Sequence, residues 1–193
     1  VIMFPGATGA TPTFCRTAQE LANAGYLAIG VDMYGTGADI STPKAAGVHF
    51  EALLNDPDLL RARVIAWFEA VCAREDVDAT RVSAIGYCFG GKCVLELARG
   101  GTPVRSVSSF HGLLTTHSPA QPNTFQGYAA IWTGGRDPYA PLSDLESLKA
   151  EFTAAGIDYQ TTVFANAQHS FTDPENDGIA PGIAYNYLAD RTS

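Results

Sequence analysis

Cysteines, basic residues and long apolar runs are all scarce in this sequence of 193 residues. The four cysteines, at positions 15, 72, 88 and 93, form no C-x-x-C pair and have no histidines at the spacing of a zinc site. No apolar run approaches the roughly 18 to 20 residues that a membrane-spanning helix requires, and no targeting segment is recognisable. We therefore expect no metal, no cofactor and no membrane contact, and we expect reduced thiols in the cytoplasm.

Positive charge is also too sparse for a nucleic-acid surface. The 12 Lys and Arg residues are scattered and are outnumbered by 20 Asp and Glu residues, which gives a formal net charge of −8. Hydrophobic residues make up 46% of the sequence, enough to build the core of a single domain over residues 1–193. We expect a monomer or small homo-oligomer whose partner is a small molecule rather than nucleic acid.

Short apolar segments alternate with longer helical patterns along the chain. This alternation is typical of βαβ units and predicts an α/β fold, with a mostly parallel sheet flanked by helices. The expected strands span residues 1–4, 26–31, 82–85, 104–110, 129–132 and 159–164. The expected helices span residues 13–24, 57–74, 89–99 and 142–155, and a short last helix is expected within 182–189.

Two stretches lack both patterns. Residues 34–50 are rich in Gly, Thr, Ala and Pro, and residues 118–127 contain two prolines. Long loops in a compact domain are usually functional or disordered, and ligands of open α/β sheets bind outside the carboxyl ends of the strands. We expect both stretches to form walls of a pocket.

A cysteine stands where the chain passes from a strand to a helix. The sequence G-Y-C-F-G-G at 86–91 follows an apolar run and precedes a helical one, which matches the nucleophile elbow G-x-S-x-G with Cys88 in place of serine. The small residues on either side are needed because the chain turns too tightly for larger ones. A buried cysteine is most often an inert small hydrophobe, so the nucleophile hypothesis depends on partners elsewhere in the chain.

Those partners occur in the order that the fold requires. Asp137 follows the strand at 129–132, and His169 follows the strand at 159–164, so both emerge at the same sheet edge as Cys88. His169 would act as the base toward the Cys88 sulfur, and Asp137 would hold the imidazole and stabilise its charged form. Alone, Asp137 could be a turn residue and His169 a core residue. Their joint placement predicts a catalytic triad.

An oxyanion hole is expected beside this triad. Its first donor would be the backbone N–H of Phe89, the residue after the nucleophile. The second would come from the glycine-rich loop after the first strand, from Gly6 or Ala7.

Three more residues are candidates for contacting the substrate. Tyr87 adjoins the nucleophile, His111 follows the strand at 104–110, and Arg136 precedes the proposed acid. His111 could equally be a solvated loop histidine, and Arg136 could be structural only.

Four segments together indicate a family. They are G-Y-C-F-G-G at 86–91, S-F-H-G at 109–112, G-G-R-D at 134–137 and H-S-F at 169–171, and they resemble dienelactone hydrolases of the α/β-hydrolase superfamily over nearly the whole chain. The resemblance implies a Cys-His-Asp triad that opens a lactone ring or cleaves a small ester through a thioester acyl-enzyme. It also implies a substrate carboxylate bound by arginine, for which Arg61, Arg63, Arg81 and Arg136 are the candidates.

The sequence departs from the family in two ways. Family members that hydrolyse dienelactone have a glutamate in the loop after the strand matched by residues 1–4, whereas residues 6–10 contain no carboxylate. Relatives also have strands before this one and a fuller last helix, so we expect this chain to lack the first strands and the end of the last helix. The substrate therefore need not be dienelactone. A general carboxylesterase or thioesterase, and a non-catalytic or redox-sensing protein with an oxidisable Cys88, are the alternatives.

Overall fold

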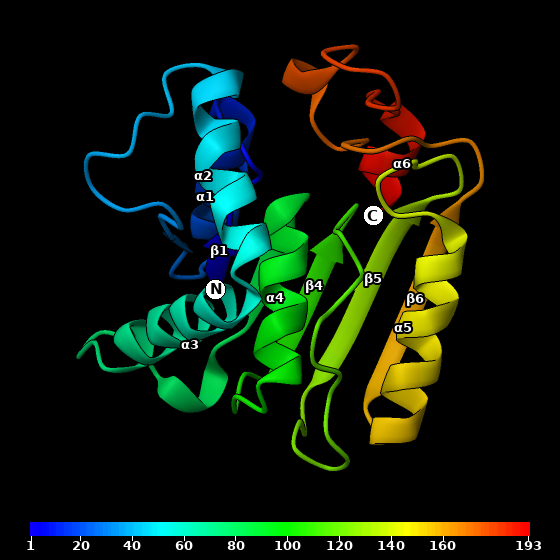
Figure 1. Cartoon of the computed structure of the whole chain (residues 1–193). Helices are drawn as coiled ribbons and strands as arrows, with labels where there is room; N and C mark the ends of the chain where they lie inside the picture. The colour runs from blue at the N-terminus through cyan, green and yellow to red at the C-terminus, as the bar shows by residue number, and fades with distance from the viewer.

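All six strands of the computed structural model, which describes residues 1–193, belong to one parallel sheet (Figure 1). Their order across the sheet is β2-β1-β3-β4-β5-β6. The strands are β1 (Ile2–Phe4), β2 (Ile29–Gly30), β3 (Ala84–Tyr87), β4 (Ser106–Phe110), β5 (Tyr128–Gly134) and β6 (Asp158–Phe164). The predicted parallel sheet is confirmed, although the strand expected at 26–31 is reduced to two residues.

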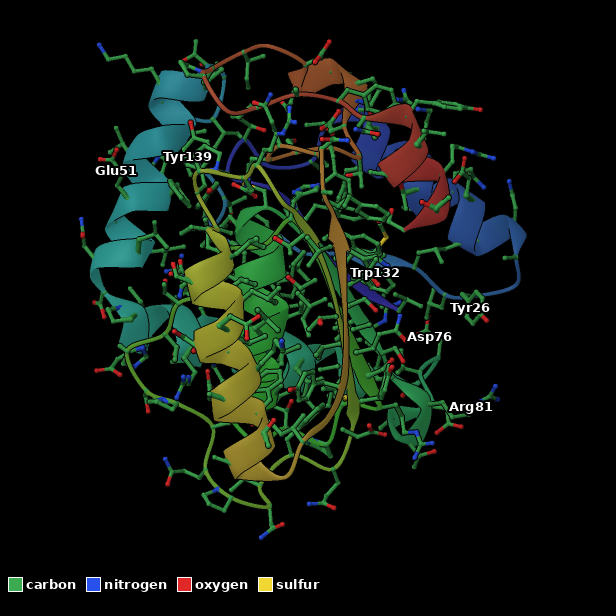
Figure 2. The ribbon with its side chains drawn as sticks, turned by 90° about the vertical axis from the view of Figure 1, so that its right-hand side faces the viewer. Tyr26, Glu51, Asp76, Arg81, Trp132 and Tyr139 are labelled. Carbon is green, nitrogen blue, oxygen red and sulfur yellow. The ribbon has the colours of Figure 1, made fainter.

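Helices cover both faces of the sheet, which explains why β1 is apolar and buried along its whole length. Figures 1 and 2 show α3, α4 and α5 on one face and α1 and α6 on the other. The helices are α1 (Pro12–Asn23), α2 (Pro43–Asn55), α3 (Pro57–Cys72), α4 (Phe89–Arg99), α5 (Leu142–Ala155) and α6 (Tyr187–Thr192). Short 3₁₀ turns lie at Ala79–Arg81 and Pro174–Asn176. None of the helices has both the length and the apolar character to cross a membrane.

Helix α2 corrects the sequence prediction, which had a loop over 34–50. Thr42 caps this helix by accepting a hydrogen bond from the Ala45 N–H at 3.1 Å, and Pro43 occupies the first turn, where its missing N–H costs nothing. Leu53 is buried and anchors the helix to the core. The other expected loop, 118–127, has no helix or strand, and neither stretch lines the cavity beside Cys88 as expected.

Three aromatic rings align the central strands just before the sheet edge. Tyr87, Phe110 and Trp132 are register partners on β3, β4 and β5, and their rings stack with centroids 5.0 and 4.6 Å apart. Phe14 of α1 packs on the edge of Tyr87 at 6.4 Å, so the row lies on the α1 face. Such cross-strand pairs fix the register of the strands, and therefore the positions of the loops that follow them.

Helix α4 is buried along its whole length, although it contains three charged residues. Burying a charge is tolerated only when it is paired, and Glu96 lies between two guanidinium groups, 2.6 Å from Arg61 and 3.1 Å from Arg99. Arg99 also binds Glu151 of α5 at 2.8 Å, and the Lys92 ammonium donates to the Thr115 carbonyl at 2.6 Å. This network ties α4 to α3, α5 and the loop after β4.

We expect Glu96→Gln to lower the free energy of unfolding by about 3 to 5 kcal/mol, because it removes the carboxylate that pairs with Arg61 and one of the two that pair with buried Arg99. Urea unfolding measures the change. Glu146→Gln is the matched control: its exposed pair with Lys149 at 2.9 Å should contribute less than about 1 kcal/mol. Equal losses in the two variants would contradict the role of the network.

Candidate active site

The turn at Cys88 can be made only with glycine on both sides. Cys88 has φ 55° and ψ −115°, a conformation that non-glycine residues rarely adopt. A Cβ atom added to Gly86 would collide with the Gly90 carbonyl, and one added to Gly90 would collide with the Phe4 carbonyl. The start of α4 is thus pressed against the ends of β1 and β3, which raises the cysteine above the sheet edge.

His169 and Asp137 lie together at the same edge. His169 Nδ1 is 2.8 Å from Asp137 Oδ2, and both residues are buried. The other carboxylate oxygen, Oδ1, accepts hydrogen bonds from the backbone N–H groups of Tyr139 at 2.8 Å and Ala140 at 3.1 Å. The carboxylate is therefore fixed in orientation, and it in turn fixes the ring of His169.

Cys88 and His169 shift one another's protonation. Burial alone would raise the pKa of the Cys88 thiol, but the charge of His169, a hydrogen bond from its ring, and hydrogen bonds from the Ala7 and Phe89 N–H groups outweigh it and lower the pKa. Burial would lower the pKa of His169, but the Cys88 sulfur and the hydrogen bond to Asp137 raise it to about 10. These opposite shifts, aided by the positive end of α4, favour a thiolate facing an imidazolium.

The N–H groups of Phe89 and Ala7, both expected in the oxyanion hole, are among the causes that lower the pKa of the Cys88 thiol. Phe89 begins α4, and Ala7 lies in the loop after β1, where the Gly9 N–H donates to the Gly6 carbonyl at 3.0 Å. Of the two alternatives in this loop, Ala7 contributes to this pKa shift, and Gly6 packs near the nucleophile. A Cβ atom added to Gly6 would lie 3.6 Å from the Cβ atom of Cys88.

His111 is a buried member of the site, not a solvated loop residue. Burial and the charge of His169, whose ring centroid lies 5.4 Å away, lower the pKa of His111 well below its usual range, so its ring is neutral. Its Nδ1 lies 3.1 Å from the Cys88 N and accepts this N–H jointly with the Phe110 carbonyl, which is 3.0 Å away. The proton is therefore on Nε2, which donates to Thr172 Oγ1 at 2.8 Å. This leaves the hydroxyl proton of Thr172 free for another acceptor.

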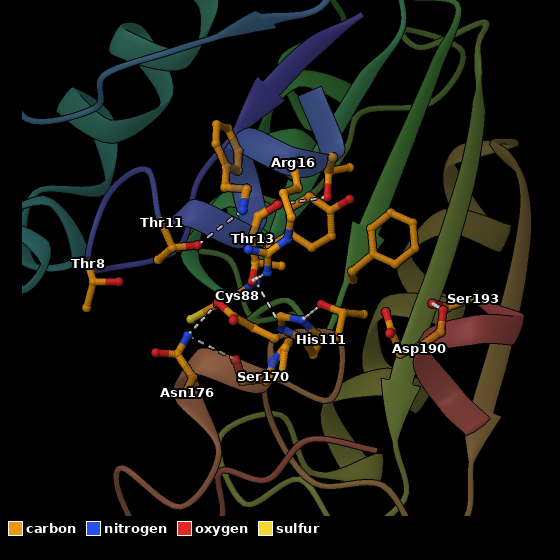
Figure 3. A pocket seen from close by; sticks show the side chains of 18 of the residues that line it. Thr8, Thr11, Thr13, Arg16, Cys88, His111, Ser170, Asn176, Asp190 and Ser193 are labelled. Atoms are coloured by element: carbon orange, nitrogen blue, oxygen red, sulfur yellow. Dashed lines mark hydrogen bonds between the residues drawn. The ribbon is translucent and has the colours of Figure 1, made fainter. Parts of the chain in front are cut away.

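A polar cavity of about 360 Å³ opens beside the cysteine. Figure 3 shows Cys88 and His111 at its centre, with Thr13 and Arg16 of α1 on one side and Ser170 on another. Hydroxyl groups dominate its lining: Thr8, Thr11, Thr13, Thr17, Tyr87, Ser170, Thr172 and Ser193. Its charged lining residues are Arg16, Arg191, Glu20, Asp173 and Asp190. Most of this lining was not predicted from the sequence, because it depends on how the segment after His169 packs against α1.

Of the secondary candidates, Tyr87 and His111 line this cavity, but Arg136 does not. Arg136 is exposed, which argues against the predicted substrate contact.

The other three arginines considered from the sequence also lie outside the cavity. Arg61 belongs to the buried network of α4, and Arg63 donates to the Met33 carbonyl at 2.7 Å. Arg81 lies in the 3₁₀ turn before β3 (Figure 2) and does not line the cavity.

The site contains no set of ligands for a metal, since no three His, Cys, Asp or Glu side chains in the structure are grouped closely enough to hold an ion. The reactive groups of the site are the Cys88 sulfur, the His169 imidazole and the backbone N–H groups beside them.

A sequence profile of the Dienelactone hydrolase family matches residues 1–193. The chain belongs to the dienelactone hydrolase family. It has the α/β-hydrolase fold and is a carboxylic ester hydrolase, and both properties agree with the predictions from the sequence.

Solved structures of the family superpose closely on this chain. The structure called m3DLH has 33% sequence identity and a TM-score of 0.90, and the match covers 99% of this chain and 80% of the other. A dienelactone hydrolase-like promiscuous phosphotriesterase, P91, from metagenomic libraries has 31% identity and a TM-score of 0.88 with the same coverage. A Bradyrhizobium sp. protein named "Probable 2-oxo-3-(5-oxofuran-2-ylidene)propanoate lactonase" is 26% identical over 94% of this chain and 76% of its own length.

The opposite pKa shifts predict how the cysteine reacts with iodoacetamide as pH changes. Because the pKa of Cys88 is lowered, its alkylation rate should rise with a midpoint below about 8.5, the value of an ordinary thiol. His169→Gln removes the imidazolium and leaves burial opposed only by the two backbone N–H groups, so its midpoint should lie above that of the parent. Cys88→Ser gives the background from exposed Cys15. An unchanged midpoint in His169→Gln would contradict the ion pair.

Proposed function

We propose that the chain hydrolyses small carboxylic esters or lactones through Cys88, His169 and Asp137, with a thioester acyl-enzyme as the intermediate. The observation that carries the proposal is the grouping of an ionisable sulfur, an imidazole fixed by a carboxylate at 2.8 Å, and two backbone N–H groups. Each step of acyl transfer has a group in reach.

In the first half of the reaction, the Cys88 thiolate attacks the carbonyl carbon and the carbonyl π electrons move onto oxygen. The N–H groups of Ala7 and Phe89 stabilise the resulting oxyanion. When the oxyanion collapses, the ester C–O bond breaks and the leaving alkoxide takes the proton of the His169 imidazolium. With a lactone the alcohol stays attached to the acyl group, so the acyl-enzyme has a free hydroxyl.

In the second half, neutral His169 takes a proton from water while the water oxygen attacks the thioester carbonyl. Collapse of this second oxyanion breaks the C–S bond and releases the carboxylic acid. The thiolate and the imidazolium are thereby restored. Asp137 stays ionised throughout and holds the ring in the tautomer that presents Nε2 to the sulfur and the water.

The cavity favours small, polar substrates that are uncharged. Its volume of about 360 Å³ and its many hydroxyl groups suit a short acyl group or a hydroxylated ring better than a long alkyl chain. Its two arginines are outnumbered by its three acids, and Arg16 already contacts Glu175 at 3.4 Å. A substrate carboxylate therefore finds no excess positive charge, which agrees with the absence of the glutamate that accompanies dienelactone hydrolysis.

We expect Cys88→Ala to lower hydrolysis of p-nitrophenyl acetate by at least about a thousandfold while the fold is retained, because no other group in the site can form the acyl-enzyme. Cys15→Ala is the matched control, since Cys15 is exposed and does not line the cavity, and it should leave the rate unchanged. Undiminished turnover in Cys88→Ala would reject the proposal.

The same assay separates the remaining alternatives. A redox or non-catalytic role would give rapid alkylation of Cys88 but no more than one turnover of ester per protein. A panel of p-nitrophenyl acetate, an acyl thioester, an uncharged lactone and dienelactone distinguishes ester or lactone hydrolysis from a thioesterase activity. We expect the uncharged lactone to have a higher kcat/KM than dienelactone.

A further inference from the structure

The two residues whose N–H groups are expected to form the oxyanion hole, Ala7 and Phe89, are both in contact with one side chain, that of Tyr34. Its hydroxyl donates to the Ala7 carbonyl at 2.7 Å. Its ring stacks on Phe89 at an interplanar angle of 8°, with the ring centroids 6.1 Å apart. Ala7 and Phe89 come from different parts of the chain, and no covalent constraint sets the spacing of their N–H groups.

From this double contact we propose that Tyr34 is a positioning residue for the oxyanion hole. This inference rests on the proposed function. The hydrogen bond fixes the Ala7 carbonyl, and with it the backbone of the residue whose N–H would donate to the oxyanion. The stacked ring holds Phe89 at the first position of α4, and Phe50 of α2 closes the other side by packing edge-on at 5.3 Å.

Tyr34 cannot itself donate to the oxyanion. A phenol has one O–H, and that proton is already used by the Ala7 carbonyl. Burial raises the pKa of Tyr34 far above neutral pH, so the hydroxyl keeps its proton whenever the enzyme is active. The Tyr34 hydroxyl can therefore affect the oxyanion hole only through the backbone of Ala7.

Tyr34 is held firmly enough to act in this way. The Asp32 carboxylate accepts hydrogen bonds from the Tyr34 N–H at 2.8 Å and the Gly35 N–H at 3.1 Å. From α3, the Trp67 indole donates to the Asp32 carbonyl at 3.0 Å, and Arg63 donates to the Met33 carbonyl at 2.7 Å. The segment that carries Tyr34 is thus fastened to a core helix, which gives Arg63 a structural role in place of the substrate contact considered from the sequence.

Tyr34→Phe tests the inference because it removes the hydroxyl and keeps the ring. We expect kcat for p-nitrophenyl acetate to fall about tenfold, the effect of losing one positioning hydrogen bond in the transition state, with little change in KM. Iodoacetamide alkylation, which forms no oxyanion, should stay within about twofold when measured where the sulfur is fully ionised. Tyr34→Leu, which also loses the stacked ring, should lower kcat further.

The matched control is Tyr159→Phe. The Tyr159 hydroxyl also donates to a backbone carbonyl, that of Lys149 at 3.3 Å, but it lies between α5 and β6, where its ring packs on Phe152. The inference is overturned if the two Phe variants have the same kcat, or if acylation and alkylation of Tyr34→Phe fall by the same factor. Thermal unfolding confirms that each variant is folded. Cys88→Ala is measured alongside, because activity in that variant would reject the proposed function instead.

Discussion

The close approach of backbone to backbone at the start of α4 is the constraint on which the site depends. Gly86 and Gly90 let the helix begin in contact with the carbonyl ends of β3 and β1, at distances that no Cβ atom could occupy. This contact has three consequences. It forces Cys88 into its strained conformation, it aims the first N–H groups of α4 at the sheet edge, and it brings the loop of Ala7 within reach of the sulfur. The buried charge network of α4 then keeps the helix in this position.

Two histidines lie side by side in this site with opposite protonation, and their neighbours explain the difference. His169 has a carboxylate on one nitrogen and the sulfur on the other, so both neighbours favour its charged form. His111 has a backbone N–H on one nitrogen and the Thr172 hydroxyl on the other, so no negative charge offsets the burial of a positive one. A second imidazolium would also be repelled by the first. The neutral ring of His111 serves as an acceptor for the Cys88 N–H, which supports the strained turn.

The sequence predicts those parts of the structure that depend on local pattern. The bounds of α4 and α5 agree with the prediction, and the chain order of Cys88, Asp137 and His169 anticipates the edge at which they meet. Parts that depend on packing between distant segments were not predicted. The start of α2 has a clear signal in Thr42-Pro43, but its interior glycine and mixed composition obscured the helical pattern. The burial of His111 follows from the segment around Thr172 folding over it, and no local pattern specifies that contact.

In the proposed mechanism, the same two N–H groups stabilise negative charge at two different atoms. At rest they help to lower the pKa of the Cys88 thiol, and in the transition state they would donate to the substrate oxygen. The charge leaves the sulfur as the C–S bond forms and develops on oxygen within the same small volume, so the donors need little reorganisation. With no carboxylate in the loop of residues 6–10 to hold the resting cysteine, these donors and His169 are what keep the thiolate stable before substrate arrives. The spacing of Ala7 and Phe89 must therefore suit both states, and Tyr34, which contacts both residues, is the side chain through which that spacing would be set.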